Sequence, residues 1–381
     1  MRIVIIGSGI AGTYIANKLK EKDRTLNISL LSDEIYPPYD RIHLCRLVDS
    51  SENVNGISIA LNPTVRLELN QKIINIDREK KRIFTKDSMF SYDKLIIATG
   101  SLPLTLFDIQ NISNAAVCRS ADDTKRIREG VTKREVVIVG SGPIALELLE
   151  TLNEMAIVKH ITVLVRGKYL YSKDISRDAI KTIEQAYMSN DKVCISYEDE
   201  IVEKEVKNSQ ITLLKTKKLE IENPFLIFGV GIKPNIEPFR EILKSKRGLL
   251  TNTYMQTEDE NIYAIGECAE VETLNFVAGH VKACTLQADC AISHILGIEL
   301  EEFKREIDID MLKVGTFDLI EISSTYFTPE YEKVLMSAKA ENRIDEYFFN
   351  DERLSRFIGI NSNVDVAYLA NLMKSGKKVD I

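Results

Sequence analysis

Short apolar runs alternate with amphipathic helical patterns in two separate stretches of the chain. The first stretch begins with the apolar run Arg2–Ile6, passes through a helical pattern and reaches a second apolar run at Ile28–Leu31. The same order recurs from Glu135–Val139 to Ile161–Val165. Short apolar runs that are flanked by helices are typical of buried parallel strands. We therefore predict two doubly wound α/β units.

The pattern changes beyond about residue 305. Leu312–Ile322, Lys333–Ala340 and Arg356–Ile360 each have the composition of a strand, and Val364–Lys374 has the periodicity of a helix. The sequence therefore predicts a small α+β domain after the two α/β units.

Each α/β unit has a glycine-rich turn between its first strand and its first helix. The first turn reads GSGIAG and the second reads GSGPIA, in which alanine replaces the third glycine. Such turns let the backbone approach a pyrophosphate, whose charge is then held by free N–H groups and the helix dipole. The predicted phosphate-binding residues are Gly7, Gly9, Ile10, Ala11 and Gly12 in the first turn, and Gly140, Gly142 and Ala145 in the second.

The two units differ in the residue expected to bind a ribose. A dinucleotide-binding fold carries an acid about 20 residues after the turn, which accepts from the ribose hydroxyls. Asp33 and Glu34 stand there in the first unit, and we favour Glu34 without separating the two. In the second unit Val165 and Arg166 stand there instead. An arginine can bind a 2′-phosphate, which favours NADP; the alternative is a surface arginine beside a degraded nicotinamide site.

Composition limits the partners. With 44% hydrophobic and 28% charged residues among 381, the chain resembles a soluble globular protein of two or three domains. The net charge of -7 argues against nucleic acid, and no stretch approaches the roughly 20 apolar residues that cross a membrane. Six cysteines without CxxC spacing argue against a metal site or a disulfide framework, and favour a cytoplasmic setting.

Three further motifs follow a fixed order along the chain. Tyr92–Ser101 reads YDKLIIATGS, Gly229–Asn235 reads GVGIKPN, and Thr257–Ala269 reads TEDENIYAIGECA. With the glycine turns, they resemble the FAD- and NAD(P)-dependent pyridine nucleotide-disulfide oxidoreductases over about residues 1–300. Tyr39–Leu44, and Glu267 in place of the family's usual aspartate, are similar to the FAD domain of the nitrite reductase large subunit. The length and the C-terminal domain look more like NADH:rubredoxin oxidoreductases.

The resemblance implies an α/β protein with two Rossmann-like dinucleotide-binding domains and a small C-terminal α+β domain. A discontinuous FAD-binding domain would cover residues 1–115 and 232–304, an NAD(P)-binding domain residues 116–231, and the small domain residues 305–381. Beyond the first glycine turn and the acids, the FAD contacts it implies are Arg41, Ala98, Thr99, Gly100, Gly266, Glu267, Val277 and Lys282.

Some of these residues also have simpler interpretations. Arg41 would close over the pyrophosphate, and Lys282 would lie at a helix N-terminus that stabilises reduced flavin. Either could equally be an exposed residue. Glu147, at the position of the family's acid after the second turn, is the candidate catalytic residue near the nicotinamide. A glutamate on an amphipathic helix can also be plain surface.

The resemblance implies an enzyme in which NADH or NADPH reduces FAD, and FAD passes electrons to an acceptor. That acceptor would be a small redox protein such as rubredoxin, or a small molecule. Steering an acidic carrier needs local positive charge, which Lys215–Lys218 and Lys374–Lys378 supply only as short clusters. Because no siroheme or iron–sulfur part is present, we expect no nitrite reduction by this chain alone.

Two alternatives stay open. One is an NAD(P)H oxidase, peroxidase or disulfide reductase in which Cys45 faces the flavin. The HLCRL sequence around Cys45 lacks the glycine and proline of the S-x-x-x-C-G-x-P pattern of such enzymes. The other is a non-catalytic flavoprotein sensor or subunit whose nicotinamide site has decayed, which Val165 motivates.

Overall fold

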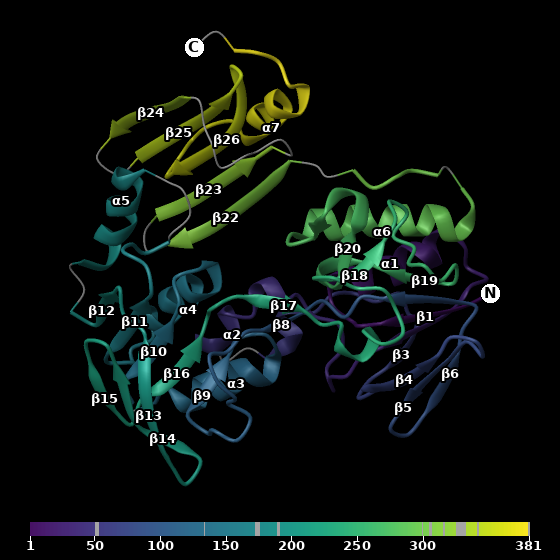
Figure 1. Cartoon of the computed structure of the whole chain (residues 1–381), viewed down its shortest axis with the longest axis horizontal. Helices are drawn as coiled ribbons and strands as arrows, with labels where there is room; N and C mark the ends of the chain where they lie inside the picture. The colour runs from purple at the N-terminus through teal and green to yellow at the C-terminus, as the bar shows by residue number, and fades with distance from the viewer. Residues whose placement is uncertain are drawn as a thin grey trace. The chain divides into compact units, whose positions relative to one another are not determined.

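The chain folds into two compact units, each assembled from segments that are separated in the sequence (Figure 1). The computed structural model describes residues 1–49, 53–132, 134–171, 176–188, 191–298, 300–304, 307–314, 317–324, 333–340 and 343–379. The first unit comprises Met1–His43, Ser51–Leu102 and Ile232–Arg305, and the second comprises Leu44–Ser50, Pro103–Gly231 and Glu306–Ile381. The division into three domains stays a prediction.

The first unit is built on a five-stranded sheet with the strand order β19-β7-β1-β2-β3, and all neighbouring strands run parallel. Its strands are β1 (Arg2–Ile6), β2 (Asn27–Leu31), β3 (Arg66–Glu68), β7 (Lys94–Ile97) and β19 (Ile262–Ala264). Because β2 and β7 lie on opposite sides of β1, the chain leaves β1 at a switch point of the sheet, where α/β folds bind ligands.

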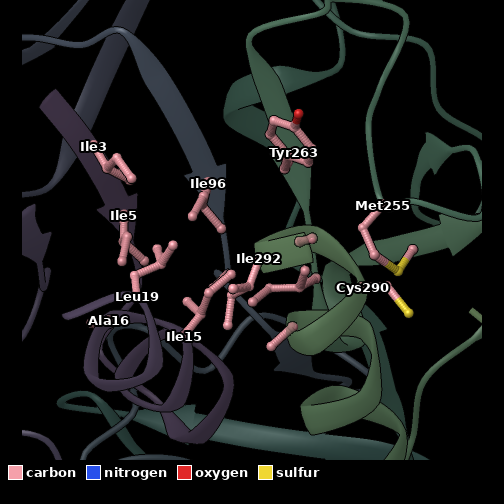
Figure 2. Packing of buried hydrophobic residues seen from close by; sticks show 14 of the residues in the cluster. Ile3, Ile5, Ile15, Ala16, Leu19, Ile96, Met255, Tyr263, Cys290 and Ile292 are labelled. Carbon is pink, nitrogen blue, oxygen red and sulfur yellow. The ribbon is translucent and has the colours of Figure 1, made fainter. Parts of the chain in front are cut away.

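Strand β1 is buried on both faces, because its alternate residues enter two hydrophobic clusters. Ile3 and Ile5 lie in the same cluster as residues of helices α1 (Ile10–Lys22) and α6 (Val281–Leu296), as Figure 2 shows. Val4 belongs to the cluster on the opposite face. Burial on both faces explains why the strand appears in the sequence as an uninterrupted apolar run.

Smaller elements complete the first unit. Two three-stranded sheets are formed by β4 (Ile73–Asp77), β5 (Arg82–Thr85) and β6 (Met89–Ser91), and by β18 (Leu249–Thr251), β20 (Ala269–Val271) and β21 (Phe276–Val277). β8 (Ser101–Pro103) pairs with β17 (Ile232–Pro234). The 3₁₀ helices of the chain are η1 (Arg41–His43), η2 (Val54–Ile57), η3 (Glu237–Phe239), η4 (Gly266–Cys268) and η5 (Glu272–Leu274).

The second unit contains another parallel five-stranded sheet, with the order β12-β11-β10-β16-β9. Its strands are β9 (Ala115–Val117), β10 (Val136–Val139), β11 (Ile161–Val165), β12 (Val193–Tyr197) and β16 (Phe225–Phe228). The helices of this part are α2 (Arg46–Asp49), α3 (Ala121–Gly130), α4 (Pro143–Glu154) and α5 (Arg177–Met188). An antiparallel sheet of β13 (Ile201–Lys207), β14 (Gln210–Thr216) and β15 (Glu220–Glu222) follows.

The C-terminal part of the second unit is an antiparallel sheet with helix α7 (Val366–Ser375) packed on one face (Figure 1). Its order is β22-β23-β26-β25-β24. The strands are β22 (Asp308–Val314), β23 (Phe317–Ser323), β24 (Lys333–Ala340), β25 (Arg343–Asn350) and β26 (Arg353–Ile360). The mixed α/β fold predicted from the sequence is confirmed.

No helix in the described part of the chain is long and apolar enough to span a bilayer.

Two details of the C-terminal sheet differ from the sequence-based expectation. Leu312–Ile322 is not one strand, because β22 ends at Val314 and pairs antiparallel with β23. Strand β25 was not expected, because charged residues stand at its start. In the sheet Asp345 is buried and its Oδ2 lies 2.6 Å from the Arg343 guanidinium, so pairing compensates part of the cost of burial.

Candidate dinucleotide-binding sites

The first glycine turn cannot accept side chains at two of its glycines. Gly7 has a φ of +106°, and a Cβ there would lie 2.3 Å from the carbonyl oxygen of Ala98. A Cβ on Gly12 would lie 1.9 Å from the Gly7 oxygen. The turn is anchored by the Gly7 N–H, which donates to Leu31, and by the Ala98 N–H, which donates to Ile6. Glycine is therefore required here by packing of the turn against the end of β7.

The middle glycine of this turn faces open space instead. A Cβ on Gly9 would meet only the Arg41 Nε, at 3.7 Å. Gly9 is also the N-cap of α1, where no side chain caps the helix and no acid lies in the first turn. The first N–H groups of α1 and the helix dipole thus remain available to a phosphate. This cradle, which a single Cβ would fill, fits the pyrophosphate of FAD.

The structure separates the two acids that the sequence could not. Asp33 is exposed, whereas Glu34 lies 2.7 Å from the Arg41 guanidinium and accepts from the Tyr39 hydroxyl at 2.6 Å. The Arg41 guanidinium also lies 4.6 Å from the centre of the Tyr39 ring. Burial lowers the pKa of Arg41, but Tyr39 and Glu34 outweigh it and raise that pKa overall. Glu34 and Arg41 thus stand together beside Gly9; their roles stay predictions.

A second set of hydrogen-bonded side chains lies around the motif at Thr257–Ala269. The Ser101 hydroxyl donates to Glu267 at 2.7 Å, and the Thr99 hydroxyl donates to the Asn235 oxygen at 2.7 Å. The Gly266 N–H donates to the side-chain oxygen of Gln287, at 2.7 Å.

Gln287 and Ser101 were not among the predicted site residues. The Gln287 side chain on α6 is fully buried, and its Nε2 has no hydrogen-bond partner among the described residues. A buried amide donor without a partner is costly, so this donor fits a bound polar group. Gln287 belongs to none of the sequence motifs, and Ser101, the last residue of the Tyr92–Ser101 motif, was not singled out. Their hydrogen bonds to Gly266 and Glu267 reveal them.

Helix α6 also has an N-terminus that can bind an anion. Its N-cap residue His280 makes no capping hydrogen bond with its side chain, and the first turn contains no acid. Val277 ends the preceding strand β21, and Lys282 lies in the first turn of α6. The expected flavin contacts at Val277 and Lys282 stay predictions.

The second glycine turn repeats the geometry of the first. Gly140 has a φ of +118°, and a Cβ there would lie 2.3 Å from the Gly229 oxygen, just as Gly7 meets Ala98. A Cβ on Gly142 would meet nothing within 4 Å. A Cβ on Gly229 would lie 2.9 Å from the Ala145 Cβ, so helix and strand pack closely although alanine replaces the third glycine. This turn also leaves room for a phosphate.

Strand β11 ends in a residue whose side chain has no acceptor for a ribose. Val165 is buried, with 1% of its surface exposed, and the next residue, Arg166, is exposed. The nearby Asp199 is buried and accepts from the hydroxyls of Ser196 and Thr216. The charged side chains exposed beside this strand end include Arg166 and also Glu198, whose N–H donates to the Gly167 oxygen.

Glu147 lies beside two cysteines within the second unit. Its Oε2 is 3.8 Å from the Cys45 Sγ, which is 4.0 Å from the Cys118 Sγ. Contact with Cys118, then burial and the Glu147 charge, raise the pKa of the Cys45 thiol. A thiol that is protonated in this way attacks only as a base takes its proton, and the Glu147 carboxylate is in contact with it. The predicted role of Glu147 near the nicotinamide stays a prediction.

Comparison with known proteins agrees with this arrangement. A family model described as pyridine nucleotide-disulphide oxidoreductase matches residues 1–288. The chain is 26% identical over 330 residues to the assimilatory nitrate reductase electron transfer subunit of Bacillus subtilis, covering 84% of this chain and 42% of that protein. It is 25% identical over 360 residues to the NADH-rubredoxin oxidoreductase of Clostridium acetobutylicum, and the match covers 90% of this chain and 89% of that protein.

The fold has close counterparts among solved structures. The covalent putidaredoxin reductase–putidaredoxin complex matches with a TM-score of 0.86 and 19% identity, over 98% of this chain and 93% of that one. The chain spans less than half the length of two of its curated relatives, the nitrate reductase subunit and the nitrite reductase [NAD(P)H] of Bacillus subtilis.

Proposed function

Because the chain belongs to the pyridine nucleotide-disulphide oxidoreductase family, we propose that it oxidises NAD(P)H and passes the electrons through bound FAD to a small redox carrier. When bound, FAD would accept a hydride and release its electrons to the acceptor. The observation that carries the proposal is the repeated turn, in which Gly9 and Gly142 each leave open the N-terminus of a helix.

The first unit supplies the residues that would hold FAD. The N–H groups that open α1 bind the pyrophosphate, and Arg41 adds positive charge at Gly9. Glu34 accepts from the adenosine ribose, which requires its hydrogen bonds to Arg41 and Tyr39 to adjust. Ser101 positions Glu267 toward the ribityl chain.

The second unit would hold the nicotinamide dinucleotide, with a preference for NADPH. Buried Val165 offers the ribose hydroxyls no acceptor, whereas exposed Arg166 can bind a 2′-phosphate. A guanidinium matches a phosphate in geometry as well as in charge. Glu147 is the residue of this unit proposed to act near the nicotinamide.

The acceptor follows from the relatives rather than from a charged surface. Acids pair with three lysines of these clusters: Lys215 lies 3.4 Å from Glu203, Lys217 2.8 Å from Glu200 and Lys378 2.8 Å from Asp351. We therefore propose a carrier whose docking depends little on these lysines. A cytoplasmic location is part of the proposal, since all six cysteines are free thiols.

Anaerobic titration of the purified protein tests this proposal. We expect a yellow protein whose flavin absorbance is bleached within seconds by NADPH, more slowly by NADH, and restored by an oxidised rubredoxin-like carrier. Dithionite serves as the control reductant. A flavin that dithionite bleaches but neither nucleotide does would exclude hydride transfer and favour the sensor or subunit alternative. Protein that binds no FAD would refute the proposal as a whole.

A further inference from the structure

We propose that Cys45 and Cys118 form a reversible disulfide by exchange with a low-molecular-weight disulfide, and that the bond ties the Leu44–Asp49 segment to the turn before α3 within the second unit. The two Sγ atoms lie 4.0 Å apart. A disulfide bond measures about 2.05 Å, so the sulfurs need to approach by about 2 Å.

The backbone around both cysteines allows this approach. Cys45 lies in the turn just before α2, and Cys118 lies between the end of β9 and the start of α3. Neither residue is part of a strand or a helix, so closing the gap breaks no ladder of backbone hydrogen bonds.

A contact from α3 already holds the two segments together. The Arg128 guanidinium donates to the carbonyl oxygens of Leu47 and Val48 in α2. Helix α3 begins with a capping box in which Ser120 and Asp123 bind each other's backbone N–H groups. The reduced protein thus presents the two thiols to each other before any bond forms, which favours ring closure over reaction with separate molecules.

Glu147 provides the proton acceptor that this chemistry needs. Cys45 is half-buried and Cys118 is buried, so a small disulfide reaches Cys45 first. The raised pKa of Cys45 keeps it protonated at neutral pH, and its thiol points at the Glu147 Oε2, 3.8 Å away. The Cys45 sulfur therefore loses this proton only as it attacks the small disulfide, and the Glu147 carboxylate receives the proton in the same step.

The exchange then proceeds in two balanced steps. The Cys45 sulfur attacks one sulfur of the small disulfide, whose S–S bond breaks, and the departing thiolate takes up the proton from Glu147. The Cys118 sulfur next attacks Cys45, loses its proton to solvent and releases the second small thiolate, which solvent protonates. In total, two protein thiols are oxidised and one small disulfide is reduced to two thiols.

Mass spectrometry of the FAD-loaded full chain tests the proposal. The reduced protein is incubated with oxidised glutathione under nitrogen, alkylated and digested without reduction. We expect a linked peptide pair containing Cys45 and Cys118, which dithiothreitol separates. Cys194→Ser, a matched control at an exposed cysteine, should give the same pair. Cys118→Ser should instead retain glutathione on Cys45.

Either of two results would overturn the inference: alkylated, unlinked Cys45 and Cys118 while Cys194 carries glutathione, or lasting glutathione on Cys45 of the wild-type protein.

The role of Glu147 has its own test. Glu147→Gln should slow glutathione attachment to Cys45 by at least about tenfold. Glu154→Gln, an exposed position of the same helix, should leave the rate unchanged. Equal rates in all three proteins would refute the proton-transfer step. These readouts do not involve nicotinamide, so they can fail or succeed independently of the proposed function.

Discussion

At the scale of single residues, the two dinucleotide-binding turns differ most where their second strands end. Glu34 presents a carboxylate that Tyr39 and Arg41 hold in place, whereas Val165 is buried and Arg166 is exposed. A carboxylate accepts from ribose hydroxyls and repels a 2′-phosphate, while an arginine does the reverse. We propose that one backbone geometry thus serves two different nucleotides through one or two side chains.

The preference for NADPH should therefore depend on Arg166. Losing a hydrogen bond to a charged group costs about 1.5–3 kcal/mol, so Arg166→Ala should raise the KM for NADPH by roughly ten- to a hundredfold. The KM for NADH should change little. Lys159→Ala, which removes an exposed cation at the opposite end of β11, serves as the control. Steady-state kinetics with both nucleotides decides the matter, and equal losses for both would contradict the assignment.

Tyr92 should limit stability at high pH. Burial raises the pKa of this tyrosine from 10.0 to about 12. A pKa that is higher in the folded state stabilises the protein fully below pH 10.0, and this contribution is lost as the pH rises towards about 12. We therefore expect unfolding over this range, with Tyr263 contributing in the same direction.

Tyr92→Phe tests this expectation. The Tyr92 hydroxyl has no hydrogen-bond partner among the described residues, so its removal should raise the free energy of unfolding at pH 7 by about 1 kcal/mol. Denaturation followed by circular dichroism should also show unfolding at higher pH. Tyr368→Phe, at an exposed position, should change neither quantity. A less stable Tyr92→Phe protein would show that the hydroxyl has a partner.

At the scale of elements, the sites are made by helix N-termini that strands and glycines keep open. Helices α1 and α4 both start at a glycine N-cap without a side-chain cap. The fold does not require glycine at these positions, because a Cβ on Gly9 or Gly142 would clash with nothing, and we propose that the free space is for a ligand. Gly7 and Gly140 differ, since their positive φ and neighbouring carbonyls require glycine for folding.

Two alanine substitutions should therefore separate the two sites. Gly9→Ala should fold but bind FAD roughly ten- to a hundredfold more weakly, because the Cβ costs about 1–3 kcal/mol of overpacking against the pyrophosphate. Gly142→Ala should keep its FAD and lose affinity for NADPH by a similar factor. Flavin fluorescence on dilution measures the first, and stopped-flow reduction the second. If both variants lose only FAD, the second turn does not bind nicotinamide dinucleotide.

At the scale of the whole molecule, cofactor binding should appear as stability. A ligand that binds only the folded state, at about 100 times its Kd, adds about 2.7 kcal/mol to the free energy of unfolding. Removing FAD should therefore lower the midpoint of thermal unfolding of the wild-type protein, and adding FAD back should restore it. The Gly9→Ala protein at the same FAD concentration should respond less. Calorimetry with no FAD effect on the wild-type protein would contradict specific binding.

The α/β fold and its glycine turns could be predicted because they depend on local patterns. Buried strands such as Arg2–Ile6 and Ile161–Val165 must be apolar on both faces, so they stand out in the sequence. A left-handed φ and a close carbonyl demand glycine at Gly7 and Gly140, and this demand fixes the motif spacing. Steric and periodic constraints of this kind act over a few residues, so the sequence by itself determines them.

Contacts between distant segments were decided only by the tertiary structure. Cys45, Cys118 and Glu147 come from three separate segments, and their spacing in the sequence does not predict that they are in contact. The ion pair of Arg41 with Glu34, rather than with Asp33, likewise depends on where the loop places Arg41. The orphaned amide of Gln287 shows only once α6 lies against Gly266. Such contacts depend on how the whole chain packs around its hydrophobic cores, and local residue preferences do not determine that packing.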